Sequence, residues 1–130
     1  TKTKVEIKKS VRHVKTKSGE FALKINIFLR AKKDVENLAL IEKVPAIVKI
    51  YNKFGATKPD KIDPESRRLR WNVGDLNSGE ERIFSYIVYS KIGVIGKFSL
   101  PESKAVFESD GKIQETHSNI VHFMSDQVKR

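Results

Sequence analysis

The stretch EFALKINIFLR, residues 20–30, alternates between apolar and mostly polar side chains. The large apolar side chains share the odd positions: Phe21, Leu23, Ile25, Ile27 and Leu29. A period of two is typical of a strand with one buried and one solvent-exposed face, whereas a helix needs apolar residues three and four positions apart. The stretch therefore predicts a β-strand that contributes one face to a core.

The same alternation recurs, more loosely, along the rest of the chain. It predicts strands near residues 5–7, 38–44, 48–51, 69–73 and 83–89, the last being apolar on both faces and hence central. A long polar loop is expected over residues 55–66. In residues 104–123, two strands are expected around Asp110-Gly111, because this dipeptide supplies the positive φ angles of a two-residue hairpin turn.

These segments amount to seven or eight short strands with turn signals between them and no convincing helix. They predict an all-β fold, with an antiparallel β-sandwich as the expected architecture and a small barrel as its main competitor. The length of 130 residues fits one domain. Within it, residues 1–18 are expected to form a basic N-terminal edge strand and linker, and residues 19–125 the sandwich core.

Composition excludes several classes of site. The chain has no cysteine, which rules out disulfides, thiolate catalysis and cysteine-ligated metals. No run approaches the ~18 apolar residues of a membrane span. The net charge of +10 is concentrated in residues 1–70, which carry 19 Lys and Arg against 8 Asp and Glu. Such an asymmetry can mark a face that meets an anionic partner, although a solvated edge strand protected by lysines is an equally physical explanation.

The candidate anion-binding residues are the basic side chains of the N-terminal stretch and of the segment before the tryptophan. They are Lys2, Lys4, Lys8, Lys9, Arg12, Lys15, Lys17, Arg67, Arg68 and Arg70. Alternation places Trp71 on the inward face with Leu69, and Arg68 and Arg70 on the opposite face. General attraction to a polyanion is therefore expected, but no aromatic platform for stacking bases.

No motif predicts catalysis or a cofactor. GDLNSG, residues 74–79, spaces its glycines like the start of a phosphate loop, but Glu80 and Glu81 follow instead of the required lysine and hydroxyl residue. In a strand, His117 and His122 point to opposite faces and cannot bind one ion; Glu115 and His117 share a face but are only two ligands. We therefore expect no enzyme, no metal, no cofactor and no small-molecule substrate.

The segment RLRWNVGDLNSGEERIFSYIV, residues 68–88, resembles the signature of a prokaryotic surface-repeat family called domain of unknown function eleven. The matching positions are Trp71, Val73, Gly74, Leu76, Gly79 and Glu80, with Ser78 where the family usually has proline. Residues 42–45, EKVP, look like the family's Asp-x-Leu-Pro, and residues 119–121, NIV, are similar to its closing strand. The likeness extends over about residues 20–123 and departs at residues 30–37, where the family has an Asn-x-Gly turn.

The resemblance implies an immunoglobulin-like sandwich, strung in arrays on bacterial or archaeal envelopes, with no catalytic residues. Leu76 would close one end of the sandwich, and Glu80 would bind turn amides. The expected function is a non-enzymatic structural or interaction module of a larger cell-surface or membrane-associated protein of a prokaryote, with an archaeal source expected, that serves as a spacer, assembly or adhesion unit beside other domains or repeats. The alternative is a basic module, cytoplasmic or near a membrane, that docks on nucleic acid, acidic lipid or acidic polysaccharide.

Overall fold

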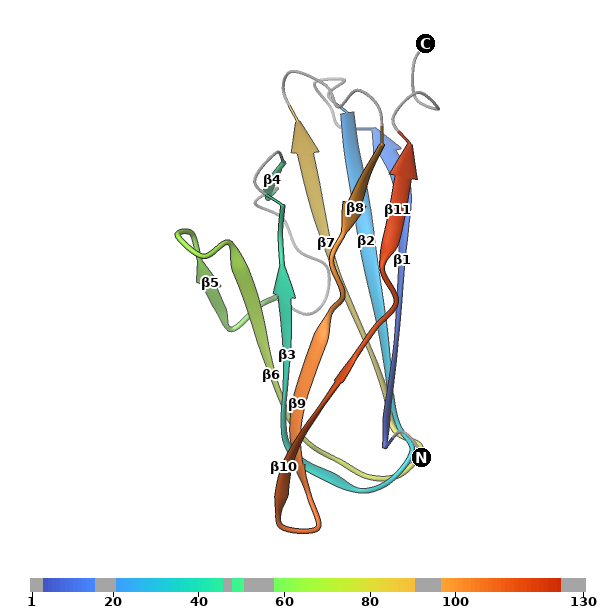
Figure 1. Cartoon of the computed structure of the whole chain (residues 1–130), viewed down its shortest axis with the longest axis vertical. Helices are drawn as coiled ribbons and strands as arrows, with labels where there is room; N and C mark the ends of the chain where they lie inside the picture. Colours follow the sequence, from blue (N-terminus) through green and yellow to red (C-terminus); the bar gives the residue numbers. More distant parts are fainter. Residues whose placement is uncertain (1–3, 16–20, 46–47, 51–57, 91–96, 125–130) are drawn as a thin grey trace.

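The computed structural model describes residues 4–15, 21–45, 48–50, 58–90 and 97–124 of the 130. All regular secondary structure in these ranges is β-strand (Figure 1). The strands are β1 (Val5–Lys15), β2 (Phe21–Ala31), β3 (Val35–Lys43), β4 (Lys49–Ile50), β5 (Lys61–Asp63), β6 (Arg68–Leu76), β7 (Glu81–Ser90), β8 (Lys97–Leu100), β9 (Lys104–Ser109), β10 (Lys112–His117) and β11 (Val121–Met124).

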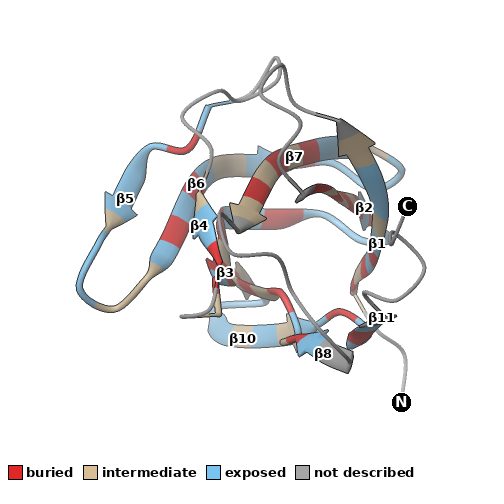
Figure 2. Cartoon of the chain, turned by 90° about the horizontal axis from the view of Figure 1, so that it is seen from above, coloured by how far each residue is buried: buried red, intermediate tan, exposed pale blue. Residues whose placement is uncertain are grey.

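The strands form an antiparallel β-sandwich, which confirms the predicted fold class. One layer is a four-stranded sheet in the order β1-β2-β7-β4, and the other is a five-stranded sheet in the order β10-β9-β3-β6-β5. A two-stranded sheet, β11-β8, continues the second layer beside β1 (Figure 1). Seen from above, the buried residues lie on the strands that surround the interior, whereas β5 lies at the outer edge and is mostly exposed (Figure 2).

The described residues form eleven strands, more than the seven or eight expected. One reason is Pro101, which has no N–H to donate and lies where β8 ends and the chain continues into β9. The partner hairpin strand is interrupted opposite it, between β10 and β11. A second reason is β5, which lies inside the stretch expected to be a polar loop and pairs with β6.

The core confirms the period-two interpretation of β2. Leu23, Ile25, Ile27 and Leu29 are all 0% exposed, as the alternation predicts. From the opposite sheet, Trp71 packs between the layers with 1% exposure, and its ring centroid lies 5.5 Å from that of Phe84. Large apolar side chains from both layers thus share one interior.

The N-terminal strand belongs to the sandwich. β1 lies at the edge of its sheet, as expected, but it pairs with β2 along its whole length and buries Val5 and Ile7. The sandwich therefore begins at residue 5, well before residue 19. Residues 16–18, the remainder of the expected strand and linker, lie outside the described residues.

Two turns agree with their sequence signals. Asp110 and Gly111, with φ of 53° and 73°, join β9 to β10 as the Asp-Gly motif predicts. Where the chain crosses from β6 to β7, Gly79 has a φ of 94° and Leu76 is 1% exposed. The Glu80 carboxylate accepts a hydrogen bond from the Asn77 amide at 2.7 Å, which confirms its expected role.

β7 is a central strand, as expected, because it lies between β2 and β4 in its sheet. Its outer face is partly apolar but incompletely covered, since Ile83 is 65% exposed whereas Ile87 and Tyr89 are half-buried.

Candidate functional site

The predicted anion-binding residues do not form one patch. Those of β1 belong to the four-stranded sheet, whereas those of β6 belong to the five-stranded sheet. Lys2 and Lys17 lie outside the described residues, and only the backbone of Lys15 is described. Lys4 pairs with Asp110 at 3.0 Å and Lys8 with Glu6 at 3.8 Å, so both already have an acidic partner.

Lys9 is a correction to the sequence-based assignment, because it is not a surface residue. Its side chain is 0% exposed and forms an ion pair with the equally buried Glu42 of β3. Its Nζ also donates a hydrogen bond to the Pro101 carbonyl at 2.7 Å. A lysine enclosed in this way cannot meet an external anion.

Lys9 and Glu42 anchor a polar network in the otherwise apolar interior. Tyr86 of β7 donates its hydroxyl to Glu42 Oε2, and Ser103 donates its hydroxyl to Oε1 at 2.6 Å. Burial first, and then the nearby Glu42 carboxylate, raise the pKa of Tyr86 well above its ordinary value. No buried side-chain nitrogen or oxygen in the described residues lacks a hydrogen-bond partner, so the network is fully satisfied.

The network ties the two layers together. Lys9 and Tyr86 come from the four-stranded sheet, whereas Glu42 comes from the five-stranded sheet. An unpaired charge in this interior would be costly, so a placement of the sheets that separates Lys9 from Glu42 is disfavoured. We interpret the role of the network as structural: it favours the observed placement of the two sheets.

A sequence signal for this pair existed but was missed. Lys9 occupies the same alternating face as Val5 and Ile7, and Glu42 the same face as Leu38 and Leu40. Each is thus a charged residue at an inward position of a strand. Two such exceptions of opposite sign predict a buried pair.

Arg67 is also structural. Its φ is 57°, and its guanidinium donates hydrogen bonds to the carbonyls of Pro45, at 3.0 Å, and Val48. These bonds hold the segment after β3 against the start of β6. Arg67 therefore does not belong to an anion-binding surface.

Arg68 and Arg70 lie on the outer face of the five-stranded sheet, as predicted, and they have basic neighbours that the sequence did not reveal. Lys61 of β5 is directly opposite Arg70, and Lys43 of β3 is directly opposite Arg68. Lys104 of β9 follows in the same cross-strand row as Arg70, across Ile41. The candidate functional site, termed here the basic face, consists of Lys43, Lys61, Arg68, Arg70 and Lys104.

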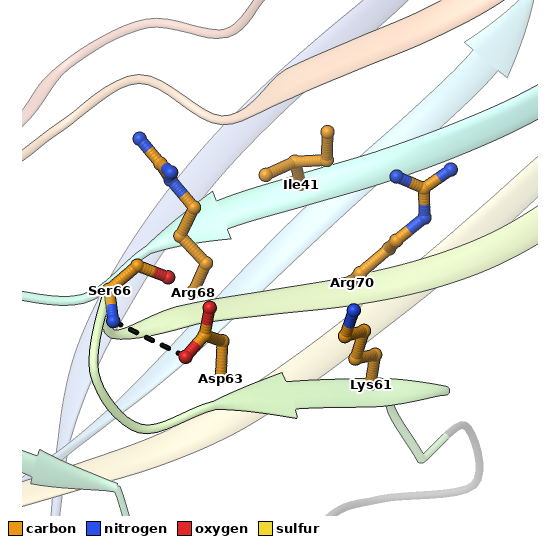
Figure 3. A pocket seen from close by; sticks show the side chains of 6 residues that line it. All are labelled: Ile41, Lys61, Asp63, Ser66, Arg68 and Arg70. Atoms are coloured by element: carbon orange, nitrogen blue, oxygen red, sulfur yellow. Dashed lines mark hydrogen bonds between the residues drawn. The ribbon is translucent and has the colours of Figure 1, made fainter.

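The basic face is hollowed. One depression of about 240 Å³ is lined by Lys61, Arg68 and Arg70 beside Ile41 (Figure 3). A second of about 220 Å³ is lined by Lys43, Arg68 and Lys104. The two share Ile41 and Arg68, so they form one shallow groove across the strands.

Acidic and polar groups also line the groove. Asp63 accepts hydrogen bonds from the backbone amides of Glu65, at 3.1 Å, and Ser66. The Ser66 hydroxyl first, and then these amides, lower the pKa of Asp63, which keeps it ionised. At the other end, His117 lies between Glu102, at 3.3 Å, and Glu115, at 2.8 Å.

The described part of the chain contains no group of three or more metal-binding side chains. It also contains no helix with the length and apolar character needed to cross a membrane.

Comparison with known proteins shows the fold and no family. No model of a known protein family matches the chain, and no curated protein is significantly similar to it. Among solved structures, it is similar to an inactive mutant of the GH20 exo-β-N-acetylglucosaminidase from Vibrio harveyi, with a TM-score of 0.57 and 13% identity. The same enzyme in complex with N-acetylglucosamine gives a TM-score of 0.50 and 13% identity.

In both matches, 90% of this chain aligns with 18% of the enzyme chain. The chain is thus similar to a small part of a much longer protein. The likeness supports the β-sandwich and carries no activity over to this chain.

Proposed function

We propose that the chain is a non-enzymatic, immunoglobulin-like module of a larger cell-surface or membrane-associated protein, in which it bears load as a spacer or assembly unit. The observation that carries the proposal is the way in which the first strand is joined to the short connection that leads into the last strand. The Asn119 side chain accepts a hydrogen bond from the Lys9 amide at 2.9 Å and donates one to the Lys9 carbonyl at 3.0 Å.

This clamp lies where it would resist tension. β1 and β11 run in the same direction and side by side, so that the start of β1 and the end of β11 lie at opposite ends of the molecule (Figure 1). Force applied through the two ends would load the clamp in shear, in which the bonds must break together and not one after another. The buried Lys9–Glu42 pair adds a second attachment of β1, to the opposite sheet.

Two further observations support a module over an independent protein. The fold occurs as a small part of a longer chain in the similar solved structures. In the segment that resembles the surface-repeat signature, Glu80 binds the Asn77 amide of its turn, Leu76 is buried and Gly79 has a positive φ, which are structural roles. We expect the parent gene to encode neighbouring domains or an anchor.

The test is single-molecule pulling of the chain held between two reference domains. Wild type is expected to unfold in one event at high force, and Asn119→Ala at a clearly lower force, because the shear-loaded clamp is lost. Asn77→Ala, an exposed asparagine in the β6–β7 turn, is the matched control and should leave the force unchanged. Equal forces for wild type and Asn119→Ala would contradict the load-bearing role.

A further inference from the structure

The basic face carries like charges in direct opposition. Lys61 on β5 is the cross-strand partner of Arg70, and Lys43 on β3 is a cross-strand partner of Arg68, whose other neighbour, on β5, is Asp63. Directly opposed like charges destabilise a sheet, so these two pairs do not contribute to holding the fold. An anion placed between them would remove the repulsion.

The five cations of the face also lack acidic partners. Within the described ranges, none of Lys43, Lys61, Arg68, Arg70 or Lys104 has a carboxylate within 4.0 Å. Arg70 donates its Nε–H to Asn72 at 2.9 Å, which orients the guanidinium along β6 without neutralising it. In contrast, Lys4, just before β1, and Lys8 and Lys9, on β1, each have an acidic partner.

We propose that the groove on the basic face binds a linear acidic polysaccharide, one that carries carboxylate or sulfate groups among its hydroxyls. The inference rests on the proposed surface module, whose partner it names. The groove crosses several strands, from Lys61 on β5 to Lys104 on β9, and therefore suits an extended polymer more than a compact ligand. Five cations against the two carboxylates of Asp63 and Glu102 favour a polyanion.

The other side chains select the kind of polyanion. No Phe, Tyr or Trp ring lines the groove in the described structure, and its one imidazole, that of His117, lies between the carboxylates of Glu102 and Glu115, so the groove offers no broad platform for stacking the bases of a single-stranded nucleic acid. The ionised Asp63 would repel the dense phosphates of duplex DNA, which carries one charge per ~1.7 Å. Asp63, Ser66 and Glu102 can instead accept hydrogen bonds from sugar hydroxyls, while the cations pair with the more widely spaced acidic groups.

The test measures binding of purified polyuronate, with uncharged dextran, duplex DNA and phosphatidylserine vesicles as alternatives. Wild type should bind polyuronate with an affinity that falls between low and moderate salt, and should not bind dextran. The double variant Arg68→Gln/Arg70→Gln should lose about tenfold or more in affinity. Lys8→Gln/Arg12→Gln removes the same charge from exposed positions of β1 and should bind nearly as well as wild type.

Thermal unfolding of the Arg68→Gln/Arg70→Gln variant checks that a loss of binding does not come from a loss of folding. The substitutions remove the like-charge neighbours of Lys43 and Lys61 and also the opposite-charge neighbour of Asp63, so the Tm of this variant should stay close to that of wild type. Equal losses in the two double variants would show a response to net charge alone and overturn the proposal. Tighter, groove-dependent binding of DNA or vesicles, or no binding of polyuronate at low salt, would also overturn it.

This result is independent of the pulling experiment. If wild type does not bind polyuronate but Asn119→Ala still lowers the unfolding force, the proposed ligand is rejected and the load-bearing role is retained. If Asn119→Ala does not lower the unfolding force but polyuronate binding depends on the groove residues, the load-bearing role is rejected and a carbohydrate-binding face is retained.

Discussion

Tyr86 shows how a single residue responds to the interior of this sandwich. Its hydroxyl is buried and donates to Glu42, and its ring centroid lies 6.3 Å from that of Trp71. Burial and the neighbouring carboxylate both disfavour the phenolate, which raises the pKa of Tyr86 well above the ordinary value. Tyr86 therefore stays protonated in the folded protein.

Stability should accordingly fall in alkaline solution. Above about pH 10, Tyr86 in the unfolded chain releases a proton that the folded protein keeps, so the free energy of unfolding decreases as the pH rises. The Tyr86→Phe variant has no ionisable proton at residue 86 in either state, so this contribution to the pH dependence is absent. At neutral pH it should be less stable by about 1.5–3 kcal/mol, because the hydrogen bond to a charged group is lost.

The measurement is urea unfolding of wild type and Tyr86→Phe from about pH 8 to about pH 11. The two proteins differ only at residue 86, so the comparison isolates the effect of the Tyr86 hydroxyl. The stability advantage of wild type should shrink above about pH 10. An advantage that is constant, or that grows with pH, would show that Tyr86 does not retain its proton in the folded state.

Among the elements, the β6–β7 connection determines how the chain passes from one layer to the other. The Gly79 amide donates to the Ala31 carbonyl at 2.7 Å, and the Ser78 amide donates to Asp34 at 2.8 Å. These bonds attach the turn to the β2–β3 connection. Because Gly79 has a φ of 94°, the turn depends on a backbone angle that other residues rarely adopt.

Gly79→Ala should therefore destabilise the fold through backbone strain. A methyl group at this position would meet no atom within 4 Å, so a steric clash is not the cause. We expect a loss of about 1–2 kcal/mol in the free energy of unfolding, measured by chemical denaturation. Asn77→Ala, in the same turn but without a positive φ, should change little. A neutral effect of Gly79→Ala would mean that the turn adopts another conformation.

At the scale of the whole molecule, the buried ion pair sets how the two layers lie against each other. Lys9 and Glu42 come from opposite sheets and are both 0% exposed. A buried pair is weak evidence for extra stability, because desolvation offsets the attraction. Its effect is to penalise any other placement of the sheets, which would leave a charge without a partner.

Glu42→Ala should destabilise the fold by about 3–5 kcal/mol, because Lys9 then loses its carboxylate inside the core. Glu36→Ala, an exposed glutamate on the same strand, should stay within about 0.5 kcal/mol of wild type. The double variant Lys9→Met/Glu42→Leu should recover most of the loss, since it removes both charges. Denaturation curves compare the four proteins; a double variant no more stable than Glu42→Ala would rule out the unpaired charge as the cause.

Local pattern determines much of this protein. Alternation identified the strands and the inward position of Trp71, and Asp110-Gly111 identified a hairpin turn, because these depend on neighbouring residues alone. The inward positions of Lys9 and Glu42 were visible in the same pattern. Their contact was not, because it depends on how two sheets pack, and a sequence period contains no information on that distance.

The basic face was decided by tertiary structure. Arg68 and Arg70 could be placed on an outer face from β6 alone, but their basic neighbours come from β3, β5 and β9. Strand order joins these residues across long stretches of chain and separates them from the equally basic β1. Charge counted along the sequence pointed to the N-terminal strand. In the folded protein Lys4 and Lys8 have acidic partners and Lys9 is buried against Glu42, whereas strand order gathers five basic residues on the other sheet.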